Sequence, residues 1–308
     1  MPLTSTITVI VPATTANLGP GFDCIGAALT LYNEFKFTSA DAGFSISVTG
    51  VEADRVKTDG SNLAYQAFLK LYQHLDQKPP SVQIDINLGV PLARGLGSSA
   101  TAIVGGLIGA NHLAGSPLNQ TEVMELAIAL EGHPDNVVPA LLGGCRLAAT
   151  NETNEWQICD IPWHQNLIPV VAIPDFELST AEARRVLPDQ VSRADAIFNT
   201  AHLGLLLRAL ETGRGDWLKA ALQDRLHQPY RQALIPGYET VRAAAVAAGA
   251  YGMVISGAGP TLLALVDTER AATVETEIAS AWKEAGITAS VRSLAIDTQG
   301  AKSFTKVA

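Results

Sequence analysis

Apolar and polar residues alternate, or β-branched residues run together, in several short parts of the chain. A period of two places successive side chains on opposite faces of the backbone and therefore predicts β-strands. The expected strands cover 6–11, 27–37, 44–48, 82–90, 168–173 and 288–293, and two more flank a glycine-rich turn within 250–266. The Pro- and Gly-rich run 12–21 is expected to end the first strand.

Apolar residues spaced three and four positions apart predict helices between these strands. The first half is expected to hold helices at 62–75, 102–114 and 121–130, the last of them capped by Thr121. The second half is expected to hold helices at 179–186, 195–212, 217–228, 236–248 and 268–285. This mixture of strands and helices is consistent with an α+β sandwich in the second half.

A short polar run at 151–155 separates two apolar parts of the chain and is the best candidate for a domain boundary. The sequence therefore predicts one domain over residues 1–153 and another over residues 154–308.

One stretch, Pro91–Thr101, joins the strand expected at 82–90 to the helix expected at 102–114. It reads P-L-A-R-G-L-G-S-S-A-T. Gly95 and Gly97 allow close approach to a ligand and positive φ, and Ser98 or Ser99 is expected to cap the helix. A helix N-terminus also offers unpaired N–H groups, which suit a phosphate. The alternative is a tight turn without a ligand, but the two serines and the arginine favour a nucleotide phosphate loop.

The whole loop is expected to surround the phosphates, although it lacks the Gly-Lys-Ser/Thr ending of the common phosphate-binding loop. The expected nucleotide-contacting residues are Pro91, Leu92, Ala93, Arg94, Gly95, Leu96, Gly97, Ser98, Ser99, Ala100 and Thr101.

Composition narrows the classes of function. The 308 residues are 47% hydrophobic and 17% charged, as expected of a compact folded protein, and the net charge of −9 argues against a nucleic-acid-binding surface. An acidic protein that binds ATP must hold the phosphates with local amides, a few arginines and a metal ion. The three cysteines have no metal-binding spacing, and no basic residue precedes Lys36, so we expect no signal peptide and a cytoplasmic protein.

Val90–Thr101 closely resembles the ATP motif of the GHMP kinase superfamily, whose pattern is apolar-Pro-x-small-x-Gly-Leu-Gly-Ser-Ser-small-small. Four further motifs resemble those of one branch, the homoserine kinase family, and they occur in the family's order. They are P-A-T-T-A-N-L-G-P-G-F-D at 12–23, E-G-H-P-D-N-V at 131–137, S-T-A-E-A-R-R-V-L-P at 179–188 and Q-P-Y-R at 228–231. The last departs from the family's E-P-Y-R at Gln228.

The resemblance implies a fold and an activity. The fold would be α+β, with an N-terminal ribosomal S5 domain 2-like α/β domain and a C-terminal ferredoxin-like α+β sandwich. The activity would be transfer of the γ-phosphoryl group of ATP to the hydroxyl of L-homoserine, with Mg²⁺, by a homodimer. Three alternatives are another small-molecule kinase of the superfamily, a non-catalytic nucleotide sensor and a purely structural domain.

The resemblance also implies substrate contacts near both ends of the chain. Asn17 would position the substrate hydroxyl, and Asp23 would pair with the substrate ammonium group. Arg184 and Arg231 would grip the carboxylate, since a guanidinium offers a fork of donors to a planar carboxylate. Thr180 would lie beside them.

The segment E-G-H-P-D-N is expected to be a polar turn. By resemblance, Glu131 and Ser98 would hold Mg²⁺, with Glu125 as the rival to Glu131. Asp135 and Asn136 would face the substrate, and Asp135 is a candidate for the base that takes the hydroxyl proton.

A glycine-rich turn, S-G-A-G-P-T at 256–261, is a hairpin turn on the simplest interpretation. In the superfamily this motif packs beside the phosphate loop, so Gly257 is expected to lie at the substrate site. Arg94 is expected to help neutralise phosphate charge in the phosphoryl-transfer step.

Overall fold

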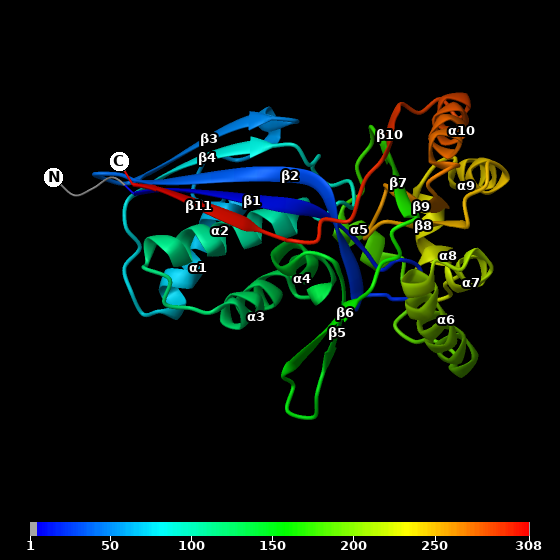
Figure 1. The fold of residues 1–308 in the computed structure, drawn as a ribbon. Coiled ribbons are helices and arrows are strands. Elements are labelled where there is room, and N and C mark those ends of the chain that lie inside the picture. Colours follow the sequence, from blue (N-terminus) through cyan, green and yellow to red (C-terminus); the bar gives the residue numbers. More distant parts are fainter. Residues whose placement is uncertain (1–4, 308) are drawn as a thin grey trace.

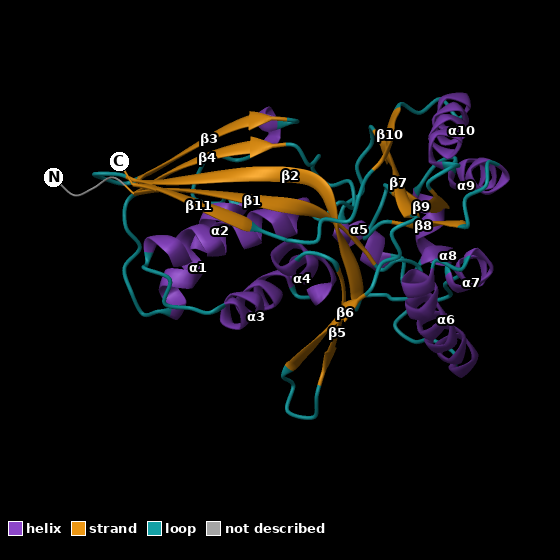
Figure 2. Cartoon of the chain, viewed as in Figure 1, coloured by secondary structure: helices purple, strands orange, loops and turns teal. Residues whose placement is uncertain are grey.

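The computed structural model describes residues 5–307, which form two β-sheets side by side with helices packed on them (Figures 1 and 2). Three clusters of buried apolar side chains form the core, one under the larger sheet, one on the outer face of the smaller sheet and one between the two layers. The α+β class predicted from the sequence is confirmed.

The larger sheet has the strand order β11-β1-β2-β4-β3, and a hairpin of β5 and β6 pairs with the first residues of β2. All of its neighbouring pairs are antiparallel except β3 and β4. Its strands are β1 Ser5–Ala16, β2 Ile25–Ser39, β3 Phe44–Gly50, β4 Val82–Leu88, β5 Cys145–Thr150, β6 Trp156–Ile161 and β11 Lys302–Val307.

Four helices cover one face of this sheet: α1 Leu63–His74, α2 Ser98–Leu113, α3 Gln120–Glu131 and α4 Pro134–Leu142. Helix α2 packs closely against β2 because it carries glycines where a side chain would collide with the sheet. A Cβ atom at Gly105 or Gly109 would run into the ring of Phe35 or Phe37, respectively. This close packing fixes the start of α2, and with it the phosphate loop, relative to the sheet.

The smaller sheet has the order β10-β7-β9-β8, with every pair antiparallel. Its strands are β7 Leu167–Pro174, β8 Gly252–Ile255, β9 Leu262–Asp267 and β10 Ala289–Ser293. With helices between β7 and β8 and between β9 and β10, this is the β-α-β-β-α-β arrangement of a ferredoxin-like sandwich, as expected.

Helices cover both faces of the smaller sheet. Helices α9 Tyr238–Ala247 and α10 Ala271–Glu284 pack on one face, and α6 Arg193–Thr212 and α7 Gly215–Ala221 pack on the other. Two short helices, α5 Thr180–Arg185 and α8 Gln228–Arg231, lie near the junction of the sheets. The remaining elements are short 3₁₀ turns, η1 Ala53–Arg55 and η2 Gln232–Leu234.

The prediction that the first strand ends at Pro12 is wrong. Strand β1 continues to Ala16, and the register of its pairing with β2 shifts between Pro12 and Ala13. A bulge is one of the few places in a sheet that tolerates proline, because the missing N–H is not needed there.

The expected domain boundary at 151–155 is instead the turn of the β5–β6 hairpin, which pairs across the division at 153. Strand β11, near the other end of the chain, also returns to the larger sheet by pairing with β1. The division into 1–153 and 154–308 therefore does not follow the sheets. We propose instead that the chain passes from the first layer to the second at 162–166 and returns after β10.

Several helix ends differ from the predictions. Neither Ser98 nor Ser99 caps α2, because the N-cap is Gly97, in the left-handed region with φ of 67°. Asn119, not Thr121, caps α3, through a capping box with Glu122.

Three further segments differ from their predicted structure. The helix expected at 217–228 ends at Ala221, and a separate turn of helix, α8, begins at Gln228. The polar turn expected at 131–136 ends at Pro134, where α4 begins. The strand at 288–293 is not the final one, because β11 follows it.

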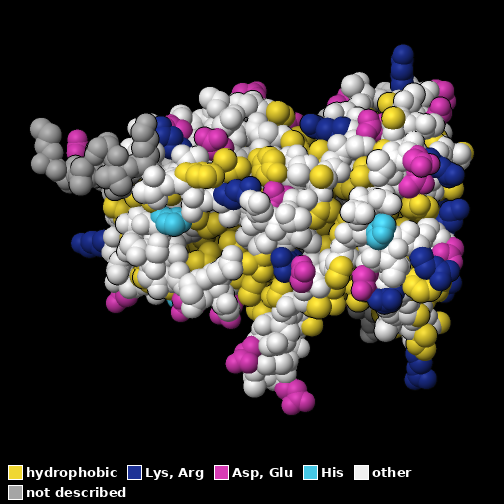
Figure 3. Space-filling view, in the orientation of Figure 1, with side chains coloured by type: hydrophobic (Ala, Val, Ile, Leu, Met, Phe, Trp, Pro, Cys, Tyr) yellow, Lys and Arg dark blue, Asp and Glu magenta, His cyan; other side chains and the backbone are white. Residues whose placement is uncertain are grey.

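On the face of the molecule shown in Figure 3, Lys and Arg side chains are scattered among Asp and Glu and form no basic patch. Among residues 5–307, no helix is both long and apolar enough to cross a membrane.

Candidate active site

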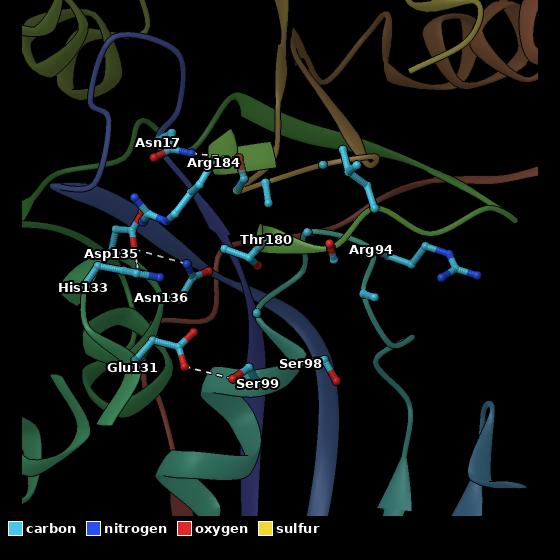
Figure 4. Close-up of a pocket in the computed structure, with 18 of the residues that line it drawn as sticks. Asn17, Arg94, Ser98, Ser99, Glu131, His133, Asp135, Asn136, Thr180 and Arg184 are labelled. Atoms are coloured by element: carbon cyan, nitrogen blue, oxygen red, sulfur yellow. Dashed lines mark hydrogen bonds and ion pairs between the residues drawn. The ribbon is translucent and has the colours of Figure 1, made fainter. Parts of the chain in front are cut away.

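A cavity of about 320 Å³ opens where loops from both sheets converge (Figure 4). All six sequence motifs contribute to its wall. The predicted site residues that line it are Asn17, Asp23, Ala93, Arg94, Gly95, Gly97, Ser98, Ser99, Glu131, Asp135, Asn136, Thr180, Arg184, Arg231 and Gly257.

The phosphate loop is built from backbone that favours glycine. Gly95 and Gly97 both have positive φ, 74° and 67°. A Cβ atom at Gly95 would collide with the carbonyl oxygen of Ser256, so only glycine lets the 256–261 turn pack on this loop. The hydroxyl of Ser256 donates a 2.7 Å hydrogen bond to the carbonyl of Gly95. Because no side chain caps α2, its first N–H groups remain available to an anion.

Five residues of the predicted loop do not line the cavity: Pro91, Leu92, Leu96, Ala100 and Thr101. Leu96, Ala100 and Thr101 are buried, and the Thr101 hydroxyl donates to the Ser98 carbonyl while it accepts from Asn33. These three side chains hold the loop in shape, and Leu92 lines a neighbouring cavity, so the prediction that the whole loop surrounds the nucleotide stays a prediction.

Arg94 does not direct its guanidinium into the cavity, contrary to the prediction that it neutralises phosphate charge (Figure 4). Its side chain is buried and donates to the backbone carbonyls of Leu92, Pro174 and Asp175. It also forms ion pairs of 3.1 Å with Glu52 and 3.0 Å with Glu177. Arg94 therefore fastens the phosphate loop to the end of β7, across the junction between the sheets.

Replacing Arg94 with methionine is expected to destabilise the protein, because three backbone carbonyls would lose a donor and Glu52 and Glu177 would keep only Arg55 as a cationic partner. Loss of one partner from a buried charge network typically costs about 3 kcal/mol. Urea unfolding should show a decrease of this size in the free energy of unfolding, and Arg55→Met, in the same network but more exposed, should cost less. If Arg94→Met unfolds like the wild type but loses ATP affinity, the assignment of Arg94 to loop support is incorrect.

Glu131 lies opposite the first turn of α2 and accepts a 2.9 Å hydrogen bond from the hydroxyl of Ser99 (Figure 4). Its expected partner was Ser98, whose side chain points away from Glu131 in this view. Burial raises the pKa of Glu131, although the bond from Ser99 partly opposes this shift. The rival residue, Glu125, is exposed on α3 and does not line the cavity.

The pair of Glu131 and Ser99 fits the requirements of Mg²⁺. This ion takes oxygen ligands and usually keeps several water molecules, so one or two protein ligands suffice beside the phosphates of a nucleotide. Among the described residues no group of three or more His, Cys, Asp or Glu side chains could form a cage of protein ligands. A buried carboxylate whose pKa is raised by desolvation would also be stabilised by a cation.

Asp135 and Asn136 lie in the first turn of α4, and both are buried. Oδ1 of Asp135 lies 2.7 Å from Nδ1 of His133. This hydrogen bond to a carboxylate raises the pKa of His133. Asn136 accepts from the hydroxyl of Thr14 and donates to Asp135. His133 also lines the cavity, although the sequence alone predicted no function for this member of the motif.

Asn17 has a φ of 72° and is almost fully buried. Its Nδ2 donates to the Gly257 carbonyl at 2.8 Å, and its Oδ1 accepts from the N–H of Asp23 at 3.0 Å. The side chain thus joins the β1–β2 loop to the 256–261 turn and holds Asp23 in the wall of the cavity.

Asp23 and Arg184 pair with each other through two parallel hydrogen bonds of 2.9 and 3.0 Å. Thr180 lines the same wall, one helical turn before Arg184. Arg231 is buried beside them, donates to the carbonyls of Gly257 and Ala183, and lies over the ring of Phe22. Burial, together with the charge of Arg184, lowers the pKa of Arg231 to about 10, so it stays charged at neutral pH.

The geometry combines a glycine-rich loop at a helix N-terminus, an acidic side chain beside it and a cluster of opposite charges at the other end of the cavity. Comparison with known proteins identifies the class. Residues 62–144 match the GHMP kinases N terminal domain, and residues 206–284 match the GHMP kinases C terminal domain. The chain is therefore an ATP-dependent small-molecule kinase of the GHMP superfamily.

Relatives that align with nearly the whole chain identify the family within this superfamily. The chain is 72% identical to homoserine kinase of Nostoc punctiforme, over 99% of this chain and 100% of that protein. It is 73% identical to homoserine kinase of Microchaete diplosiphon, over 99% of each. The chain belongs to the homoserine kinase family.

Solved structures agree with this fold. The crystal structure of homoserine kinase from Cytophaga hutchinsonii has a TM-score of 0.88 and 29% identity, over 97% of both chains. Leishmania major mevalonate kinase, at 16% identity, shares the fold with a TM-score of 0.70, over 94% of this chain and 96% of that one.

Proposed function

We propose that this protein transfers the γ-phosphoryl group of ATP to the hydroxyl of L-homoserine, a step of threonine biosynthesis, in the cavity described above. The observation that carries the proposal is the charge cluster of Asp23, Arg184 and Arg231 beside a phosphate loop. A zwitterionic amino acid needs a carboxylate for its ammonium group and cations for its carboxylate. Mevalonate carries no ammonium group and would leave Asp23 without a function.

L-Homoserine would enter between Asp23 and Arg184. In this structure the Arg184 guanidinium donates both of its hydrogen bonds at this site to the Asp23 carboxylate. The ammonium group of the substrate would replace Arg184 as the partner of Asp23. Its carboxylate would take Arg184 and Arg231, the second of which is held in place by the Gly257 and Ala183 carbonyls. The hydroxyl would then lie toward the phosphate loop, near Asn17, Asp135 and Asn136.

A second cavity, of about 250 Å³, is proposed to hold the adenine base. It adjoins the phosphate loop and shares Ala93, Ser98 and Ser99 with the first cavity. Its other walls are mostly apolar and come from α1, β2, β4, Ala102 of α2 and Val56, which follows the 3₁₀ turn η1. An apolar slot that is open at one end to a phosphate-binding helix terminus suits a nucleotide base.

Substitution of Ala102 in this slot tests the adenine assignment. Ala102→Leu is expected to raise the KM for ATP by about 10-fold, because the larger side chain occupies space needed by the base. The KM for L-homoserine should stay within about two-fold, since Ala102 does not line the first cavity. Steady-state kinetics with each substrate varied in turn measures both values. An unchanged KM for ATP would place the base elsewhere.

Mg²⁺ would be held by Glu131 and Ser99 and would neutralise charge on the β- and γ-phosphates. The protein itself contributes positioning. The first amides of α2 orient the phosphates, while Asn17 and Asn136 orient the acceptor hydroxyl.

Asp135 is the group proposed to accept the hydroxyl proton, if one is transferred to the protein. One oxygen, Oδ1, is engaged by His133 and Asn136, whereas Oδ2 makes no hydrogen bond to the described residues. Phosphoryl transfer depends more on alignment and charge stabilisation than on proton removal, so Asp135 contributes to positioning as well.

The proposal is tested by measuring ADP release from the purified protein with MgATP and, in turn, L-homoserine, L-serine, L-threonine and mevalonate. Turnover with L-homoserine far above that with the others is expected. Faster turnover with mevalonate would contradict the roles of Asp23 and the two arginines, and ATP binding without turnover on any alcohol would indicate a sensor. The homodimeric state implied by the family resemblance and the cytoplasmic location expected from the sequence also stay predictions.

A further inference from the structure

A third cavity, with a volume of about 550 Å³, lies behind the substrate pocket and is larger than it. Helices α7, α8 and α9, which lie next to one another in Figure 1, form its walls together with the start of β8. No residue that lines this cavity lines the substrate pocket. The kinase reaction proposed above makes no use of it.

Two nearly buried side chains in its wall carry a polar atom that makes no hydrogen bond to the described residues. The side-chain oxygen of Gln228 accepts from the N–H of Ile255 at 2.8 Å, which leaves its Nε2 donor without a partner. The hydroxyl of Tyr238 likewise has none. Gln228 and Tyr238 are each only 6% exposed, and neither of the two atoms is among the buried side-chain atoms that lack a partner, so what remains exposed of each side chain faces the cavity. Both therefore offer donors to a molecule in the cavity.

The charges in the wall limit the kind of molecule that fits. Lys219 forms no ion pair with the described residues, and Arg242 pairs with Glu239 at 3.4 Å. The Asp224 carboxylate has no acceptor left for a ligand, because its two oxygens already accept four hydrogen bonds. Two of these come from the N–H groups of His227 and Gln228. Two cations against two carboxylates disfavour a polyanion such as a nucleotide. Two neutral donors and a free ammonium group suit a single carboxylate.

We propose that this cavity binds a small amino or hydroxy acid through its carboxylate, which would accept hydrogen bonds from Gln228, Tyr238 and Lys219. The Tyr238 hydroxyl is a dependable donor, since burial raises its pKa to about 12 and keeps it protonated. The apolar side chains of Leu222, Val246 and Met253 would contact the rest of the ligand.

The site is connected to the substrate pocket by one turn of helix. Gln228 is the first residue of α8, and Arg231, proposed to hold the substrate carboxylate, is the last. Gln228 also bonds to Ile255, two residues before Gly257, to which Arg231 donates. A ligand that shifts Gln228 would therefore move Arg231. This coupling rests on the proposed function, whereas binding itself does not.

Binding is tested with L-threonine, L-aspartate and L-malate, using isothermal titration calorimetry and saturation-transfer NMR. The measurements use an Arg184→Met variant, in which the substrate pocket is impaired. At least one of the three is expected to bind at millimolar concentration, and L-threonine methyl ester, which lacks the carboxylate, is expected not to bind. Binding by L-malate but not by the amino acids would identify a hydroxy-acid site.

Matched variants locate the ligand. Tyr238→Phe removes only the hydroxyl, and Lys219→Met removes an exposed charge, so both should fold normally and weaken binding by about 5–10-fold. Lys283→Met, an exposed lysine on α10, is the control and should change nothing. The proposal is overturned if none of the three acids binds, or if binding is indifferent to Tyr238→Phe and Lys219→Met.

Coupling between this cavity and the substrate pocket is tested separately, by measuring the KM for L-homoserine of the wild-type enzyme with and without the bound acid. The bound acid should change the KM for L-homoserine by about three-fold or more, and Tyr238→Phe should abolish this effect. Binding without any change in KM would keep the site and refute the coupling. Absence of L-homoserine turnover would refute the proposed function and leave the binding result intact.

Discussion

Replacing Glu131 with glutamine is expected to lower kcat by about 10²–10³-fold, the loss typical for a group that stabilises developing charge. The amide keeps the size of the side chain but removes the negative charge proposed to hold Mg²⁺ against Ser99. The apparent Mg²⁺ requirement should rise at the same time, because one ligand is weakened. Initial rates at saturating ATP and L-homoserine, measured over a range of Mg²⁺ concentrations, give both quantities.

Glu125→Gln is the matched control. Glu125 is on the same helix, exposed and outside the cavity, so its substitution should leave kcat and the Mg²⁺ requirement unchanged. A large effect at Glu125 and none at Glu131 would reverse the assignment of the metal ligand.

Replacing Arg184 with methionine is expected to raise the KM for L-homoserine by about 10–100-fold, because a charged hydrogen bond to the substrate is worth about 1.5–3 kcal/mol. The KM for ATP should change little, since Arg184 is at the far end of the cavity from the phosphate loop. Arg184 is partly exposed, so the variant should fold. Steady-state kinetics with L-homoserine as the varied substrate measures the effect.

The neighbouring Arg185 provides the control for a general loss of positive charge on α5. Its side chain is exposed and does not line the cavity. Arg185→Met should therefore keep the KM of the wild type. Equal effects of the two substitutions would indicate long-range attraction of the substrate instead of a specific contact.

Hydrophobic periodicity predicted most of the fold because each regular element buries one face. Strands β2, β4 and β7 and helices α1 and α10 were all predicted within a few residues of their observed ends. The predictions failed where a local signal was overruled by distant partners. Pro12 reads as a strand end but lies at a bulge in β1, and β11 has no strong alternation of its own.

The motifs contain most of the residues that line the cavity, but they do not give the direction in which each side chain points. Arg94 stands in the middle of the phosphate loop, and nothing local shows that its partners are Glu52, Glu177 and the end of β7. The choice between Ser98 and Ser99 depends on the position of Gly97 as the N-cap, which sets the phase of α2. The sequence did not reveal the slot proposed for adenine, because apart from the phosphate loop most of its residues come from α1, β2 and β4 and belong to no motif.

The pairing of β1 with β11 also bears on how the protein is made. Strand β1 is made long before its partner at residues 302–307, so this side of β1 stays unpaired while the residues between them are translated. Such distant contacts slow folding, and an open edge strand can pair with other chains in the meantime. The larger sheet is therefore completed only after the whole smaller sheet has been made, although each sheet has its own core. Newly made chains should be most prone to aggregation just before β11 emerges.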